Sequence, residues 1–168
     1  MSCLSSIAQI TDYLYLCGER AITRYRLNKI GITNVINCTL DVPNRREPGI
    51  KCVQIRIPDH PFSRLDVHFD KIADMIHAIN LQGGKVLVHC VAGVSRSATL
   101  CIVYFMKHQK MTLFEAHDFV WNRRRIIHPN PGFWKQMIAY EKKLYGRNTV
   151  KMVNTIVGPV ANIYLMGL

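Results

Sequence analysis

Residues 85–108 read KVLVHCVAGVSRSATLCIVYFMKH, and this stretch decides the fold class. It opens with a short apolar run at residues 85–88, which predicts a buried β-strand. A tight loop from His89 to Arg96 follows, and an apolar segment of helical periodicity then extends to about His108. A strand that passes through a short loop into a helix is typical of α/β proteins.

The chain before this stretch alternates between strands and helices. Short β-like runs, each bounded by Gly, Pro, Asp or Asn, occur at residues 7–10, 13–17, 33–38 and 52–57. A helix is expected over residues 19–30, closed by Gly31. Apolar residues then return every three or four positions from Leu65 to Ile79, which predicts an amphipathic helix that stops at the following glycine pair.

Two further helices are expected after the central stretch. Thr112 and Glu115 have the spacing of a capping box, and a helix should extend from there to about Asn122. Asn130 precedes a proline, which places an N-cap before a proline at the first helical position, and that helix should end near Gly146. Because strands precede and alternate with helices, the predicted class is α/β, with helices packed on a small sheet.

Length and composition predict one globular domain. The chain has 168 residues, of which 49% are apolar and 20% are charged, and this excludes a disordered tail protein and a collagen-like repeat. No internal repeat or Ser/Gly-rich linker divides the chain. We assign residues 1–146 to the domain and residues 147–168 to a C-terminal tail, whose weak pattern leaves open whether it packs on the domain.

An intracellular location is expected. No apolar run approaches the roughly 20 residues that span a bilayer, and residues 1–10 lack the features of a secretory signal. The six cysteines form no C-x-x-C pair, which favours free thiols in a reducing compartment over a disulfide framework. They are Cys3, Cys17, Cys38, Cys52, Cys90 and Cys101. We expect a cytoplasmic protein, with the nucleus also open to it, and not a secreted one.

The net charge indicates anionic partners. Lys and Arg number 22 against 11 Asp and Glu, which gives +11 with histidine neutral. Such an excess favours phosphoproteins, nucleic acids or anionic membrane surfaces without choosing among them.

The loop after residues 85–88 has the composition of an anion-binding cradle. A strand that turns tightly into a helix aims successive backbone N–H groups into one concavity, and the helix dipole adds partial positive charge there. The amides of Val91, Ala92, Gly93, Val94 and Ser95 would then surround a phosphate-sized anion. The same groups would stabilise the thiolate of Cys90 at the mouth of the cradle, which makes that cysteine a candidate nucleophile.

Four residues around the cradle complete its chemistry. The planar guanidinium of Arg96 matches two oxygens of a phosphate dianion. Gly93 relieves the tightest part of the loop. Ser97 can offer its hydroxyl to the Cys90 sulfur as that sulfur leaves a phosphocysteine, and His89 can hold the loop through hydrogen bonds to backbone groups. In the alternative interpretation, the cysteine is an ordinary core thiol.

The loop residues 89–98, HCVAGVSRSA, resemble the signature H-C-x5-R-[ST] of the cysteine-dependent protein tyrosine phosphatases, and in particular the small atypical dual-specificity phosphatases. The resemblance extends from IAQI at residues 7–10 through NPGFW at 130–134 to NTVKMV at 148–153. It implies a single domain with a central, mostly parallel twisted sheet flanked by helices. It also implies hydrolysis of phosphotyrosine and of phosphoserine or phosphothreonine in proteins, without a metal.

The family also uses a general acid from an upstream loop, because an alkoxide leaves poorly unless it is protonated. Asp59 is the best candidate, since it lies 31 residues before Cys90 on a loop, Pro-Asp-His-Pro, that resembles the family's acid loop. Three other aspartates compete for this role but fall on the polar face of the predicted helix. They are Asp66, Asp70 and Asp74.

Residues 123–130, RRRIIHPN, resemble the family's R-P-x-I-x-P-N segment, which supports the catalytic loop from below. Arg125 stands where proline is usual, so a looser and more basic turn is expected. The arginine triplet can also be a solvated charge run. Asn130 is expected to support the site as a helix N-cap.

No cofactor is expected, because the histidines show no metal-ligand spacing and the resemblance implies metal-free chemistry. Phosphorylated proteins are the expected partners, with kinases of signalling pathways among them, and no nucleic acid is expected. Two alternatives stay open: a phosphatase acting on phosphoinositides or RNA, and a phospho-residue binding module. Residues 91–95 lack the Lys or His that would meet the extra charge of the first class, and the second class usually lacks the cysteine, the arginine or the acid.

Overall fold

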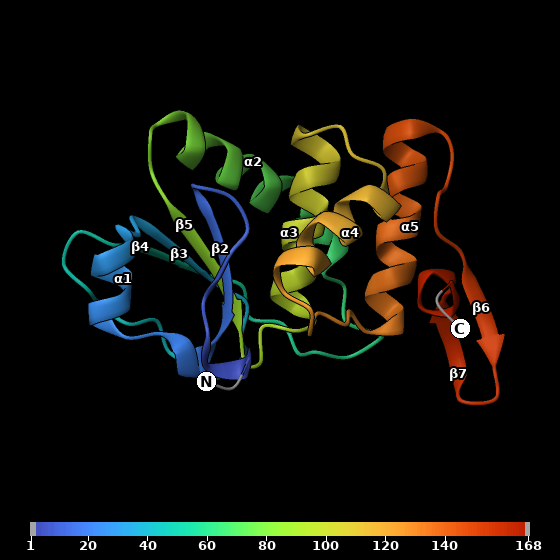
Figure 1. The fold of residues 1–168 in the computed structure, drawn as a ribbon, viewed down its shortest axis with the longest axis horizontal. Helices are drawn as coiled ribbons and strands as arrows, with labels where there is room; N and C mark the ends of the chain where they lie inside the picture. The colour runs from blue at the N-terminus through green and yellow to red at the C-terminus, as the bar shows by residue number, and fades with distance from the viewer. Residues whose placement is uncertain (1–2, 167–168) are drawn as a thin grey trace.

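The computed structural model describes residues 3–166, and Figure 1 shows its arrangement. The strands are β1 (Ala8–Gln9), β2 (Leu14–Gly18), β3 (Asn34–Asn37), β4 (Lys51–Gln54), β5 (Val86–Cys90), β6 (Met152–Thr155) and β7 (Gly158–Ala161). The α-helices are α1 (Arg24–Ile30), α2 (Phe69–Leu81), α3 (Arg96–His108), α4 (Leu113–Arg123) and α5 (Pro131–Tyr145). The 3₁₀-helices are η1 (Cys3–Ser5), η2 (Glu19–Ala21), η3 (Asp66–His68) and η4 (Asn162–Leu165).

A five-stranded sheet in the order β1-β2-β5-β3-β4 forms the centre of the molecule. β2, β5, β3 and β4 are parallel, and only the edge strand β1 is antiparallel. Helix α1 packs on one face and helices α2 to α5 lie on the other (Figure 1). The α/β fold with a mostly parallel sheet flanked by helices is confirmed.

Alternation along the central strand β5 divides the core in two. Val86, Val88 and Cys90 face the larger core under α2 to α5, whereas Leu87 faces the smaller core under α1. Because side chains alternate across a strand, the His89 side chain falls on the α1 face and Cys90 on the opposite one. The two neighbouring residues of the signature therefore serve opposite faces of the sheet.

Local signals explain most helix ends. The Thr112–Glu115 capping box is present, the Asn130 side chain accepts from the Phe133 amide, and Gly146 closes α5 in the left-handed conformation. Gly31 closes α1 in the same way. The predicted continuous helix from residue 19 is wrong at its start.

That start is displaced because Thr23 caps the helix. The Thr23 hydroxyl accepts from the Arg26 amide, so α1 begins at Arg24, and residues 19–21 form the separate turn η2. The strand predicted over residues 52–57 is also displaced. β4 pairs only from Lys51 to Gln54, because its partner β3 ends at Asn37, opposite Gln54.

Residues 147–166 pack on the domain. β6 and β7 form an antiparallel hairpin beside α5, and η4 returns the chain toward the body of the molecule (Figure 1). Val150 and Ala161 are buried in the larger core. Thr149 donates through its amide and its hydroxyl to the buried Glu141 carboxylate, at 2.8 and 2.7 Å. Within residues 3–166, no helix is long and apolar enough to cross a membrane.

Candidate active site

The carboxyl end of β5 and the first turn of α3 enclose the loop of residues 91–95. Cys90 is 2% exposed and lies at the floor of this loop, not at its mouth as expected from the sequence. Its Sγ accepts a hydrogen bond from the Gly93 amide at 3.2 Å and lies 3.0 Å from the Ser97 Oγ. The sulfur is thus held by polar groups rather than by hydrocarbon alone.

The carbonyl groups of the loop are all bound from outside. The Val91 carbonyl accepts from the Glu19 amide, and the Val94 carbonyl accepts from the His128 amide. The Ala92 and Gly93 carbonyls accept from Arg124, through Nη2 and Nε respectively. In a planar trans peptide, the carbonyl and the next N–H point in opposite directions. The N–H groups of residues 92 to 95 therefore point inward, and the Gly93 amide on Cys90 is one of them. Four of the five amides that the sequence assigns to the cradle, those of residues 92–95, therefore have this orientation.

Two glycines let the loop lie directly on the end of β2. Gly93 has φ +67°, and a Cβ there would lie 2.4 Å from the Cys17 carbonyl carbon. A Cβ on Gly18 would lie 2.7 Å from the Val91 oxygen. The sequence predicts the need for Gly93. It does not predict the need for Gly18, because that constraint comes from loop residues Val91 and Ala92, which are distant in sequence.

Arg96 is buried and joins the cradle to the loop that carries Asp59. Its Nη1 donates to the Ile57 carbonyl at 3.0 Å, two residues before Asp59. Its buried Nε has no hydrogen-bond partner among residues 3–166. A buried guanidinium N–H without a partner is costly, and an oxyanion bound in the cradle would satisfy it.

Asn130 joins three parts of the site. Its Oδ1 accepts from the Phe133 amide at the start of α5, and its own amide donates to the Ser95 Oγ at 3.0 Å. Its Nδ2 donates to Asp59 Oδ1 at 2.8 Å. The expected helix cap is thus present. The hydrogen bond to Asp59 spans 71 residues and is not visible in the sequence.

The competing aspartates are engaged elsewhere. Asp66 pairs with Arg64 at 2.8 Å, and Asp70 and Asp74 pair with Lys107 at 3.0 and 2.8 Å. Hydrogen bonds from these cations lower the pKa of all three carboxyl groups, which keeps them ionised. They are poor proton donors for that reason.

Arg124 is a member of the site that the sequence interpretation missed. It is 4% exposed, and besides its bonds to the cradle it donates to the Ser6 carbonyl at 3.2 Å. Its neighbours Arg123 and Arg125 are exposed and lie over the rings of Phe119 and Trp121. The triplet is therefore not one charge run. The sequence signal that could have identified Arg124 is its place at the first position of the R-P-x-I-x-P-N segment.

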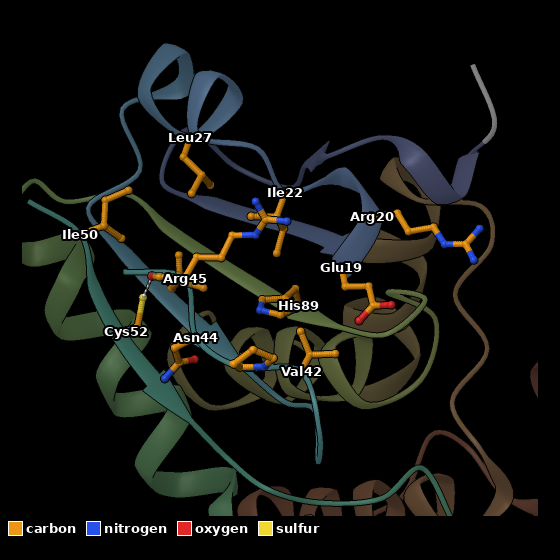
Figure 2. A pocket seen from close by; sticks show the side chains of 12 residues that line it. Glu19, Arg20, Ile22, Leu27, Val42, Asn44, Arg45, Ile50, Cys52 and His89 are labelled. Atoms are coloured by element: carbon orange, nitrogen blue, oxygen red, sulfur yellow. Dashed lines mark hydrogen bonds between the residues drawn. The ribbon is translucent and has the colours of Figure 1, made fainter. Parts of the chain in front are cut away.

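His89 stands behind the cradle. Its Nδ1 lies 3.4 Å from the Cys90 carbonyl, and its ring points into a cavity on the α1 face that Ile22, Leu27 and Arg45 also line (Figure 2). Burial lowers its pKa to about 4, so the imidazole is neutral near pH 7. This arrangement suits a scaffold rather than a proton shuttle.

The remaining cysteines differ from Cys90 in their surroundings. Burial raises the pKa of Cys17, Cys38 and Cys101, so all three stay thiols at neutral pH. Cys52 is half-buried, and its thiol lies 3.4 Å from the Arg45 carbonyl. Within residues 3–166, no three His, Cys, Asp or Glu side chains gather as a metal site would require.

Comparison with known proteins agrees with this geometry. The model of the family "Dual specificity phosphatase, catalytic domain" matches residues 14–143. Human dual specificity protein phosphatase 14 is 46% identical over 162 residues, which cover 96% of this chain and 82% of that protein. Human dual specificity protein phosphatase 18 is 45% identical over 162 residues, which cover 96% of this chain and 86% of that protein. The crystal structure of human DUSP28 superposes with a TM-score of 0.79 at 31% sequence identity. The match covers 82% of this chain and 94% of that chain.

Proposed function

The chain belongs to the dual specificity phosphatases, protein phosphatases acting on phosphotyrosine and on phosphoserine or phosphothreonine, and we propose that it works through a phosphocysteine on Cys90. The observation that carries this proposal is the set of inward-facing amides of residues 92–95, one of which donates to the Cys90 sulfur, together with the buried Arg96 Nε, which has no hydrogen-bond partner among residues 3–166. The four N–H groups of residues 92–95 and the Nε of Arg96 together form a receptor for a dianionic phosphoryl group.

In the first step, the Cys90 thiolate attacks phosphorus and the ester P–O bond breaks. Asp59 gives its proton to the departing oxygen, so the product leaves as an alcohol or a phenol and Asp59 becomes a carboxylate. Arg96 and the amides of residues 92–95 hold the three remaining oxygens as charge develops on them. Asn130 ties the carboxyl group of Asp59 to the cradle, because it also donates to Ser95.

In the second step, water attacks the phosphocysteine and the P–S bond breaks. The Asp59 carboxylate takes a proton from that water, which returns the acid to its starting form. The electron pair of the P–S bond goes to sulfur, and the Ser97 hydroxyl, 3.0 Å away, can donate to it. The products are inorganic phosphate and the regenerated thiolate.

Phosphorylated proteins are the substrates that the loop supports best. Its side chains at residues 91–95 are Val, Ala, Gly, Val and Ser, which offer no cation to a second phosphate. We propose that kinases of signalling pathways are among these substrates, and that the protein acts in the cytoplasm or the nucleus. The free state of Cys17, Cys38, Cys52, Cys90 and Cys101 supports a reducing compartment.

The test compares turnover of phosphotyrosyl and phosphoseryl peptides with turnover of phosphoinositides and 5′-triphosphorylated RNA. We expect both peptides to be hydrolysed at the higher kcat/KM, and Cys90→Ser to be inactive while still binding the peptides. Faster turnover of the lipid or the RNA would reassign the substrate. An inactive wild type that binds phosphopeptides would make it a binding module.

A further inference from the structure

We propose that Tyr164, in the C-terminal turn η4, is a positioning residue that holds Asn130 in place between the cradle and Asp59. The inference rests on the proposed function, because the place of Asn130 matters to turnover only if Cys90 and Asp59 perform the chemistry. It gives the tail, outside the matched family segment of residues 14–143, a part in the reaction.

The Tyr164 ring contacts the chain on both sides of Asn130. It stacks on His128, two positions earlier, with ring centroids 4.6 Å apart and an interplanar angle of 7°. It meets Trp134, four positions later, edge to face at 5.7 Å, and its hydroxyl accepts from Trp134 Nε1 at 3.2 Å. The ring therefore bridges the turn that carries Asn130.

The two rings that Tyr164 contacts differ in burial. Trp134 is 1% exposed and fixed in the larger core, so it is a rigid support. The His128 side chain is exposed, and Tyr164 is its stacking partner within residues 3–166. Tyr164 thus links the exposed His128 side chain to the core through Trp134.

His128 and Asn130 in turn hold both catalytic loops. The His128 amide donates to the Val94 carbonyl at 2.8 Å, which keeps the following N–H turned into the cradle. Asn130 binds Ser95 and Asp59, as described above. A shift of this turn would move the anion receptor and the acid relative to each other, and small misplacements of reacting groups cost rate.

The tail delivers Tyr164 from a fixed base. Asn162 and Lys151 join through two hydrogen bonds, from the Asn162 amide to the Lys151 carbonyl and from the Lys151 amide to Asn162 Oδ1, at 2.9 and 3.0 Å. Ala161, three residues before Tyr164, is fully buried. The position of the ring is therefore set by the hairpin and not by a loose chain end.

The experiment measures kcat and KM on a phosphotyrosyl peptide, the inhibition constant of orthovanadate, and Tm. Because an aromatic contact biases an equilibrium by about two- to tenfold, we expect Tyr164→Leu to lower kcat and to weaken vanadate by about that factor. Tyr164→Phe keeps the stack and should retain most of the activity. His128→Ala should show the same loss from the loop side, and the double variant should lose no more than either alone.

Ile79→Ala is the matched control, since Ile79 is buried at the end of α2, beside Gly84 and at the opposite end of β5 from the cradle. It should lower Tm at least as much as Tyr164→Leu and leave kcat unchanged. The inference is overturned if Tyr164→Leu and His128→Ala keep wild-type kcat and vanadate inhibition, or if Ile79→Ala loses as much activity. Should Tyr164→Leu not fold, His128→Ala alone decides. An inactive wild type or an active Cys90→Ser would instead contradict the proposed function.

Discussion

Asn130 binds the Asp59 loop, the cradle and the start of helix α5 at once. Asn130→Asp separates these roles, because a carboxylate still caps the helix but no longer donates to Asp59. Its charge would also repel the Asp59 carboxylate. We expect an unchanged Tm and a fall in kcat of about tenfold on phosphoseryl peptides. Steady-state kinetics that match the wild type would contradict this role.

Arg124 supports the cradle from outside and offers a sharp contrast with its neighbours. Arg124→Met would leave the Ala92 and Gly93 carbonyls without a donor, so we expect a loss of about 2–4 kcal/mol in the free energy of unfolding. Arg123→Met and Arg125→Met alter exposed side chains and should each cost less than about 0.5 kcal/mol. Urea denaturation of the three variants checks this order, and equal effects would refute it.

Whether a site residue can be predicted from the sequence depends on how far it lies along the chain from the residues it contacts. Eight consecutive residues contain Cys90, Gly93, Arg96 and Ser97, so one strand-loop-helix turn brings them together. Their spacing therefore predicts the site. The support from Arg124 is 31 or more residues away, and its carbonyl partners carry no side-chain signature. Backbone acceptors are present at every position, so no residue type marks them.

At the scale of elements, the acid loop and α5 fit together without space. A Cβ on Gly132 would lie 1.8 Å from the Pro61 carbonyl oxygen, so Gly132→Ala must push the acid loop or the helix away. In most helices this change stabilises by about 1 kcal/mol. Here we expect destabilisation of about 1–3 kcal/mol.

The displaced acid should also slow phosphoseryl peptides more than an aryl phosphate with a good leaving group, because the latter needs less protonation. Thermal unfolding and the ratio of the two kcat values provide the measurement. A stabilised variant with an unchanged ratio would show that the contact does not position Asp59.

Helix ends with a local signal are predictable, and the others are not. Gly31, the Thr112–Glu115 capping box and Gly146 act on their own turns, so the sequence predicts where those helices stop or start. The hairpin β6–β7 has a weak pattern because its strands are only half-buried, and it gains its order by packing on α5. Tertiary contact rather than propensity decides such an element.

For the whole molecule, two buried histidines make stability depend on pH. Burial lowers the pKa of His89 and His117 to about 4, against about 6.5 in an unfolded chain. Between these values the unfolded chain binds more protons, so this stability is complete above about pH 6.5 and falls as the pH drops toward 4. The slope approaches about 1.4 kcal/mol per pH unit for each histidine.

Urea denaturation at a series of pH values from about 7.5 to 4.5 measures that slope. His117→Phe should reduce the slope of the unfolding free energy against pH by the contribution of one histidine. Only His89 then remains buried and neutral. The carboxyl groups of Asp66, Asp70 and Asp74, whose pKa values are lowered, lose their contribution only at lower pH. A stability that is constant over this range would contradict the neutral burial of both imidazoles.

The most direct test of the whole account is capture of the phosphorylated enzyme during turnover. The protein would be mixed with excess phosphotyrosyl peptide, quenched in acid, and digested for mass spectrometry. We predict one phosphoryl group on the peptide that contains Cys90, and none in Cys90→Ser. A phosphoryl group on another residue, or undiminished turnover by Cys90→Ser, would contradict the account.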